Sequence, residues 1–262
     1  MREQASLRTL CRPSALRRSC CIRLPDEIVK DPDPSTFDAE LAFASGASPT
    51  FNSPDINTIN LWPIAPIDAI DAIVRNLSPD ASAQRTRVDV SWTPFGIGLQ
   101  RIPIFSSFVD LAKAGSGGSE QQLSWPTPTA MKATGRFSVF VDIAHPYDRD
   151  LLNNRGQQTV DGLQTSAGRS KTFTFPVRNP SSSPQSISLS IVPSPEAVWA
   201  TVSPATLSLA GGAQQNVTVK ITVPTSVPAS PAGTLITATI DLIAIAAGRL
   251  VGGISFLILV DS

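Results

Sequence analysis

The amino-acid sequence predicts an all-β protein, with two tandem antiparallel β-sandwiches preceded by a largely irregular N-terminal arm. Short runs of alternating apolar and polar residues recur between clusters of Ser, Pro, Asn and Gly, which is typical of strands joined by turns. The length of 262 residues suits about two domains. The string Val-Arg-Asn, each time followed by a Ser/Pro loop and an alternating strand, begins at Val74 and again at Val177. We therefore expect the same corner, in which one strand ends and a loop leads into the next strand, in each of the two sandwiches.

Residues 1–53 are predicted to form the arm and a linker. Residues 1–25 carry six arginines against one glutamate. Such a basic segment can bind nucleic acid, an anionic membrane surface or an acidic partner, or it can stay a solvated tail. We expect no nucleic-acid partner, because aromatic residues do not interleave with the arginines. The segment also holds every cysteine of the chain, free or intermolecular: Cys11, Cys20 and Cys21. The residues predicted to act in assembly are Arg17, Arg18, Cys20 and Cys21.

The rest of the arm shows one helical pattern and no export signal. Residues 35–44 (STFDAELAFA) predict a short helix that Ser35 could cap, and residues 45–54 are interpreted as linker. Arginines interrupt every apolar window near the start, so no signal peptide is legible. The longest apolar stretch, residues 252–260, is too short for a membrane span, and none is expected. The compartment stays open on these residues alone.

Residues 54–157 are predicted to form the first sandwich. Its expected strands are 67–76, 85–92 and 136–143, and the Gly/Ser-rich segment 113–122 is expected to be a loop.

Residues 158–262 are predicted to form the second sandwich, because seven candidate strands alternate with turn signals. The last strand is so apolar that it must be a central strand, be covered by the arm, or pair with another chain. The candidate strands are 171–179, 185–193, 198–204, 205–212, 215–224, 234–245 and 248–260.

The second region resembles bacterial immunoglobulin-like domains, including those associated with α-galactosidases and other secreted glycosidases. The resemblance is carried by VRNPSSSPQSISLSI, by Trp199 and by SPATLSLAGGAQQNVTVKITVP. The first region, which ends in VDIAHPYDRDLLNNRGQQTV, resembles the cell-adhesion-related bacterial domains of CARDB type. Both resemblances imply immunoglobulin-like sandwiches that serve as spacers, adhesive modules or assembly modules, and they favour an extracellular or surface location. A fold of this kind does not by itself fix the ligand.

No catalytic motif is present, and we expect no enzymatic activity. The single histidine, His145, has only aspartates close to it in the sequence. No nucleophile elbow, zinc-protease motif or phosphate-binding loop occurs. The string FGIGLQR at 95–101 has two glycines but no helical pattern after it, so it does not predict a phosphate cradle.

Two polar or aromatic features are candidate binding sites. Trp125 could stack on a ligand, or it could pack under the Pro-rich turn that follows it. A cluster of oxygen-bearing side chains could hold calcium, or its members could bond their own backbone in a turn. That cluster comprises Asp142, Asp148, Asp150, Asn153 and Asn154.

Two functional hypotheses remain. In the first, the chain is a non-catalytic binding or adhesion module that presents sandwich loops to a protein or a carbohydrate, with no cofactor other than a possible calcium ion. In the second, it is a structural subunit of a multi-chain filament, sheath or particle, which docks through the N-terminal arm or an edge strand. A protein partner or self-association is expected under either hypothesis.

Overall fold

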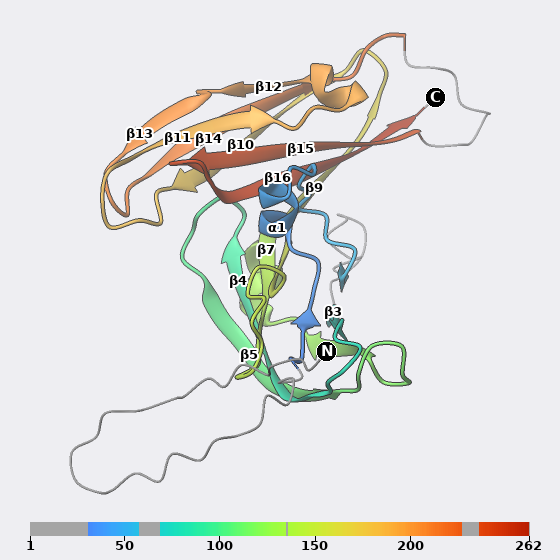
Figure 1. Cartoon of the computed structure of the whole chain (residues 1–262). Coiled ribbons are helices and arrows are strands. Elements are labelled where there is room, and N and C mark those ends of the chain that lie inside the picture. Colours follow the sequence, from blue (N-terminus) through green and yellow to red (C-terminus); the bar gives the residue numbers. More distant parts are fainter. Residues whose placement is uncertain (1–30, 58–68, 135, 227–235, 262) are drawn as a thin grey trace, which may run out of the picture.

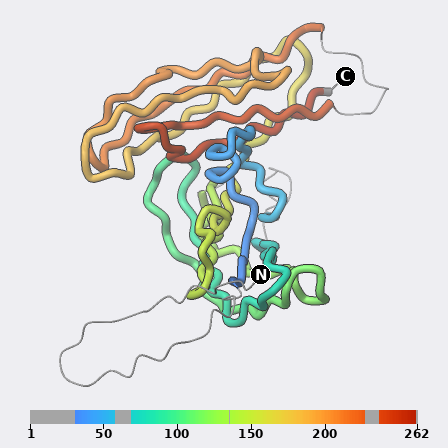
Figure 2. Tube along the Cα trace, viewed as in Figure 1, coloured from blue at the N-terminus to red at the C-terminus, as the bar shows by residue number. Residues whose placement is uncertain are grey.

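The computed structural model describes residues 31–57, 69–134, 136–226 and 236–261. The described chain is all-β and forms two sandwiches, which meet near the short helix α1, Ala39–Ala44 (Figures 1 and 2). The predicted fold class is confirmed. One strand pair departs from the antiparallel pattern, because β9 runs parallel to the C-terminal strand β16.

The first sandwich consists of two four-stranded sheets. One has the order β1-β3-β2, with β6 paired to the other edge of β3, and the other has the order β5-β4-β7-β8. Sequence reasoning missed β5 and β6. The strand bounds are β1 Pro34–Ser35, β2 Ile56–Asn57, β3 Ala69–Asn76, β4 Ala83–Pro94, β5 Ile102–Leu111, β6 Glu120–Pro126, β7 Phe137–Ala144 and β8 Arg155–Gln158, and a short helix α2, Thr129–Thr134, precedes β7.

The second sandwich pairs a three-stranded sheet of order β10-β14-β12 with a five-stranded sheet of order β13-β11-β15-β16-β9. The predicted strand at 198–204 is shorter than expected, because residues 195–199 form a 3₁₀ turn, η2. The strand bounds are β9 Val160–Ser166, β10 Ser170–Arg178, β11 Gln185–Ile191, β12 Ala200–Ser203, β13 Thr206–Leu209, β14 Gln214–Thr222, β15 Ile236–Ala246 and β16 Arg249–Asp261.

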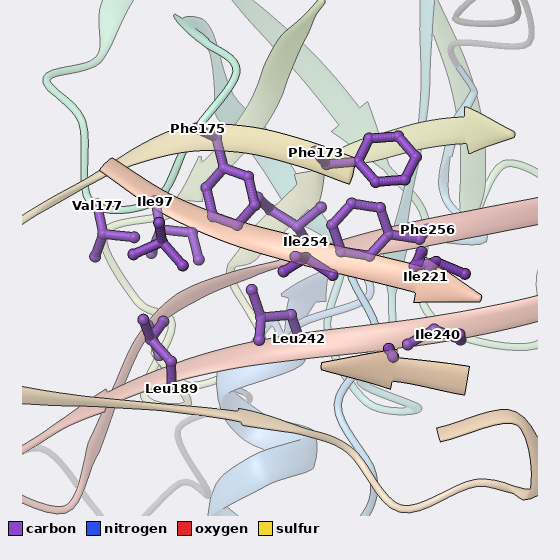
Figure 3. Close-up of a cluster of buried hydrophobic side chains, with 14 of the residues drawn as sticks. Ile97, Phe173, Phe175, Val177, Leu189, Ile221, Ile240, Leu242, Ile254 and Phe256 are labelled. Atoms are coloured by element: carbon purple, nitrogen blue, oxygen red, sulfur yellow. The ribbon is translucent and has the colours of Figure 1, made fainter. Parts of the chain in front are cut away.

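The alternating residues of each sandwich form its core. Val88, Val90 and Trp92 of β4 pack against the inward residues of β3 and β7, as period-two alternation requires. In the second sandwich, Phe173 and Phe175 of β10 meet Phe256 of β16, with ring centroids 4.9 and 6.4 Å apart. Figure 3 shows these rings among aliphatic side chains from both sheets, including Ile254, Leu242 and Ile221.

The turn after β4 inserts into the core of the second sandwich. Ile97 lies among the buried side chains there (Figure 3), and Phe95 meets Phe175 edge to face at 5.9 Å. The Ile97 N–H donates to the Pro176 carbonyl at 3.0 Å. A Cβ at Gly98 would overlap the Arg178 carbonyl oxygen, and the φ of Gly98 is +68°. The glycines within residues 95–98 therefore let the backbone of this turn lie close to the backbone of β10.

Residues 45–54 are part of the packed structure, so the linker interpretation is wrong. Phe51 is fully buried, and its ring occupies the space that a side chain at Gly253 would fill. The Phe51 N–H donates to Ser255 Oγ at 2.9 Å, and Thr50 Oγ1 donates to Asp241 Oδ1 at 3.0 Å. These residues lie on the outer face of β15 and β16. They fasten the segment between β1 and β2 of the first sandwich onto the second sandwich.

The predicted helix exists but begins later than expected, at Ala39. Ser35 lies in β1 and caps nothing, since the cap is Asp38. Asp38 Oδ1 accepts from the N–H groups of Glu40 and Leu41, and Oδ2 accepts from the Arg155 N–H at 3.1 Å. Burial raises the pKa of Asp38 to about 6, and these hydrogen bonds oppose the rise.

The repeated Val-Arg-Asn string marks the same corner in both sandwiches, as the sequence predicts. Asn76 ends β3, Asn179 directly follows β10, and both are buried. Each side-chain oxygen accepts from the N–H two residues later, and each Nδ2 donates to carbonyls of its own loop and of the distant segment that returns to the corner. Asn suits this role because one amide supplies an acceptor and two donors.

The last strand, β16, lies between β15 and β9 and is a central strand. Phe51, from the predicted arm, covers part of the outer face of β16. The second predicted alternative, coverage of the last strand by the arm, is therefore observed as well. Strand β16 pairs with β15 along one edge and, along the other, with β9 over Ser255–Asp261.

Candidate ligand-binding surface

An aromatic-lined hollow lies at the end of the first sandwich that is distant from the second. The β4–β7 register places Arg87 beside Ala144 at this end, and Pro94, which leads into the second sandwich, at the opposite end. The hollow has a volume of about 550 Å³. We call it the aromatic hollow, and its lining residues are Pro32, Ala81, Ser82, Gln84, Arg85, Phe108, His145, Pro146 and Tyr147.

Two aromatic rings of this hollow are unusually open to solvent. Phe108 of β5 is 61% exposed and Tyr147, in the turn after β7, is 66% exposed. Burying an aromatic ring is strongly favourable, so rings this exposed are candidates for ligand contact. Sequence reasoning missed both. The available signal was the single tyrosine two residues after the single histidine, in a Pro turn.

A β-bulge aims Arg85 at Phe108. The register of β4 against β5 shifts between Ala83 and Thr86, and Arg85 has a φ of +53°. Its N–H donates to Asp110 Oδ1 at 2.6 Å, and its guanidinium carbon lies 5.5 Å from the Phe108 ring centroid. Bulges and left-handed non-glycine residues are frequent where a side chain must be directed to a functional surface. The hollow thus combines a cation with flat apolar rings.

His145 is held as a fixed wall of the hollow. The Tyr147 N–H donates to Nδ1 at 3.3 Å, so Nδ1 is an acceptor. Nε2 then carries the proton and donates to the Gln84 carbonyl at 3.0 Å. The His145 and Tyr147 rings are 5.9 Å apart. Because both ring nitrogens have backbone partners, acid–base use of His145 requires breaking one of these bonds.

Three members of the predicted calcium cluster share one turn and bond one another or its backbone. Asp148 Oδ2 accepts from Asn154 Nδ2 at 2.8 Å, and Asp148 Oδ1 accepts from the Asp150 N–H at 3.0 Å. Asp150 in turn accepts from the Leu152 N–H at 3.1 Å. Burial raises the pKa of Asp148, although these bonds oppose the rise. This is the geometry of a turn in which Asp and Asn side chains hydrogen-bond to each other and to the backbone of the turn.

The other two members of the cluster face different partners. Asp142 on β7 accepts both its hydrogen bonds from Arg101, at 2.8 and 3.1 Å, and lies 3.5 Å from Arg155. Asn153 donates to Asp33 Oδ1 at 2.7 Å. Within the described ranges, no three His, Cys, Asp or Glu side chains are arranged to hold a metal ion. The five predicted residues therefore do not form one coordination shell here.

Trp125 does not form a ligand platform. It is only 9% exposed and belongs to the first core, where its ring stacks on Phe105 at 6.4 Å. The alternative, packing at the end of β6, is the one observed. A tryptophan beside a Pro-rich turn is exposed or buried according to which face of the strand it occupies, and the short β6 left that face ambiguous in the sequence.

The predicted assembly residues Arg17, Arg18, Cys20 and Cys21 lie outside the described residues, as does Cys11. Among the described residues, no helix combines the length and the apolar character that crossing a bilayer requires.

No protein-family model matches the sequence, and no curated protein matches it. Among solved structures, the chain is similar to the CupB2 chaperone of Pseudomonas aeruginosa, with a TM-score of 0.26, 16% identity, and coverage of 36% of this chain and 50% of that one. It is similar to the SrpA adhesin of Streptococcus sanguinis, with a TM-score of 0.29, 24% identity, and coverage of 39% and 56%.

A third similar structure is the CupB6 tip adhesin of Pseudomonas aeruginosa, with a TM-score of 0.24, 6% identity, and coverage of 73% of this chain and 90% of that one. The chain spans about half the length of the chaperone and of the SrpA adhesin. Likenesses at this level assign neither a family nor a function.

Proposed function

We propose that this chain is a non-catalytic binding module that takes a carbohydrate at the aromatic hollow. The observation that carries the proposal is the pair of solvent-exposed residues, Phe108 and Tyr147, which both line a hollow of about 550 Å³. The apolar face of a pyranose packs on such rings, and Gln84, Ser82 and Arg85 supply polar groups at the rim. The absence of a catalytic motif from the sequence supports a non-catalytic role.

The resemblances found in the sequence support the same proposal. CARDB-type and immunoglobulin-like modules serve as adhesive parts of bacterial surface or secreted systems, and that role favours an extracellular or surface location. In such modules one end of a sandwich carries the binding loops while the other end joins the next domain. The aromatic hollow lies at the free end of residues 54–157 and draws Pro32 from the upstream segment. A protein ligand is the alternative occupant.

Binding to an array of bacterial and host glycans, followed by calorimetry with the best ligand, tests the proposal. Tyr147→Ala is expected to weaken binding about tenfold or more, since about 1.4 kcal/mol of stacking corresponds to that factor. Val198→Ala removes an even more exposed apolar side chain, 83% exposed on the second sandwich, and should leave affinity unchanged.

Two results count against the carbohydrate assignment. One is a ligand whose affinity is equal in Tyr147→Ala and in the unsubstituted chain. The other is an array without binding, combined with a peptide or protein ligand whose affinity does depend on Tyr147, which would make the hollow a protein site.

A further inference from the structure

Arg85 differs from the other arginines of the first sandwich, because no carboxylate of the described residues pairs with its guanidinium. Each of the other described arginines between residues 69 and 158 has a carboxylate oxygen at 3.8 Å or less. Arg85 is exposed to solvent, and its guanidinium lies over the Phe108 ring, 5.5 Å from the centroid. The described part of the chain therefore leaves its positive charge without a counter-charge. The paired arginines are Arg75, Arg87, Arg101, Arg136, Arg149 and Arg155.

The bulge in β4 places this unpaired cation in the lining of the aromatic hollow. Of the residues that line the hollow, none is Asp or Glu, and Arg85 carries the charge. His145 is neutral there, because Nδ1 accepts from the Tyr147 N–H while Nε2 donates to a carbonyl. The hollow therefore presents a positive charge beside exposed rings, which suits a ligand that is both anionic and partly apolar.

The aspartates that adjoin the hollow along the chain bond other groups. Asp110 Oδ1 accepts from the backbone N–H of Arg85, at 2.6 Å, and not from its guanidinium. Asp148 and Asp150 accept from N–H groups of their own turn. Charges that are separated by solvent are screened over about 8 Å at physiological ionic strength. The guanidinium donors of Arg85 therefore stay available to an added anion.

The geometry around Arg85 favours pairing with an oxyanion. A guanidinium presents a rigid fork of N–H donors that matches the oxygens of a carboxylate or a sulfate. Contact with the Phe108 ring restrains the Arg85 side chain before a ligand arrives, so less conformational freedom is lost on binding. Ser82 and Gln84, which also line the hollow, offer a hydroxyl and an amide to the hydroxyl groups of a sugar.

We infer that the aromatic hollow takes an acidic carbohydrate, in which a sugar ring packs against Tyr147 and an anionic substituent pairs with Arg85. This inference rests on the proposed function and narrows the class of its ligand. The substituent is a carboxylate or a sulfate, because either offers a pair of oxygens to a guanidinium. A neutral sugar would lack that charge-assisted contact and bind more weakly.

Changing the ligand tests the charge on the unsubstituted full chain. An array of neutral, uronate-bearing and sulfated oligosaccharides is expected to show binding to acidic members, and its carboxylate and sulfate members distinguish the two anionic groups. Calorimetry then compares the best acidic binder with its methyl-esterified or desulfated form. The neutralised form should bind about tenfold more weakly. Added NaCl should weaken binding of the acidic form and leave that of the neutralised form unchanged.

Substitution of Arg85 tests the same contact from the protein side. Arg85→Gln should weaken the acidic ligand about tenfold and leave the neutralised ligand unaffected, so that both bind this variant alike. Arg85→Lys keeps the charge without the planar fork and should recover part of the loss. Arg169→Gln removes an exposed arginine in the turn between β9 and β10 and should leave both affinities unchanged.

The outcomes separate this inference from the proposed function. Equal affinity for the acidic and neutralised ligands, with loss of binding in Tyr147→Ala, overturns the acidic class and leaves a carbohydrate site at the hollow. A preference for neutral glycans that depends on Tyr147 does the same. An array without binding overturns both, as does an acidic glycan whose affinity changes in neither Arg85→Gln nor Tyr147→Ala.

Discussion

An Asn side chain stabilises the equivalent corner in each sandwich. Only one of the two Asn side chains, however, makes all its hydrogen bonds within the sheets and loops of its own corner. Asn179 is fully buried and bonds its own loop and the end of β13. Asn76 makes the equivalent bonds and also accepts from the Asp33 N–H at 3.1 Å, which belongs to the upstream segment. The Asn179 side chain therefore bonds only within its own sandwich, whereas Asn76 also holds Asp33, which lies before β1.

The largest effects are expected from removing these amides. Asn76→Ala and Asn179→Ala each leave several buried backbone groups without partners, which costs about 3 kcal/mol of unfolding free energy or more. Chemical denaturation measures the loss, and hydrogen exchange locates it. Asn179→Ala should raise exchange in the second sandwich and in the turn at residues 95–98 that packs beside it, whereas Asn76→Ala should release the segment around Asp33.

A matched control comes from the same loop. Ser182 is exposed, and Ser182→Ala should change the unfolding free energy by only a few tenths of a kcal/mol. If Asn76→Ala and Asn179→Ala gave identical exchange patterns across both sandwiches, the corners would not differ in the way that the hydrogen bonds indicate.

The next largest effect concerns the contact between the sandwiches. Gly98→Ala forces a Cβ against the Arg178 carbonyl at a φ of +68° and should destabilise the chain by about 2–3 kcal/mol. Gly115→Ala is the control, since Gly115 has a φ of +77° but no described atom lies within 4 Å of the position that its Cβ would take. Its cost should be about 1 kcal/mol, from the backbone alone. Denaturation curves that shift equally for both variants would mean that close packing at Gly98 contributes little.

The sequence is sufficient to predict the strands and corners of the two sandwiches. It is not sufficient to predict the contacts that join one sandwich to the other. Alternation at Val88, Val90 and Trp92 fixes the face of a strand, and the repeated Asn identifies a corner, because both are local signals. Phe51 and Ile97 read locally as loop residues. Their burial depends on partner surfaces far away in the sequence, on β15, β16 and β10, and no local period encodes that.

The candidate site was predicted less well for the same reason. Trp125 was the most prominent aromatic residue near a turn, but the Phe105 ring covers it. Phe108 and Tyr147 come together only because β4, β5 and the turn after β7 meet at one end of a sheet. A bulge at Arg85 completes the hollow. The bulge puts two exposed residues, Gln84 and Arg85, next to each other in β4. In the sequence these two polar residues look like the end of the preceding loop, so the bulge is not recognisable there.

The smallest expected effect is a pH dependence that arises at the upstream segment. The pKa of Asp38 is raised to about 6 in the folded chain by burial, with a contribution from nearby Glu40, and burial also raises that of Asp241, which Thr50 and Ser255 contact. Below the folded pKa the folded chain binds more protons than the unfolded one, so stability is greatest in acid and is lost as pH rises through about 6. Between pH 7 and pH 5 the gain from Asp38 should be about 1 kcal/mol.

Urea denaturation at a series of pH values measures this gain, and Asp38→Asn should flatten the curve because the substituted side chain does not titrate. Asp80→Asn, at a solvent-exposed aspartate in the Ser/Pro loop after β3, is the control and should leave the slope unchanged. A stability that rises from pH 5 to pH 7 would contradict the raised pKa values. It would also mean that the carboxylates of Asp38 and Asp241 hold residues 31–57 in their charged forms, so that the backbone N–H groups and hydroxyls around them outweigh the cost of burial.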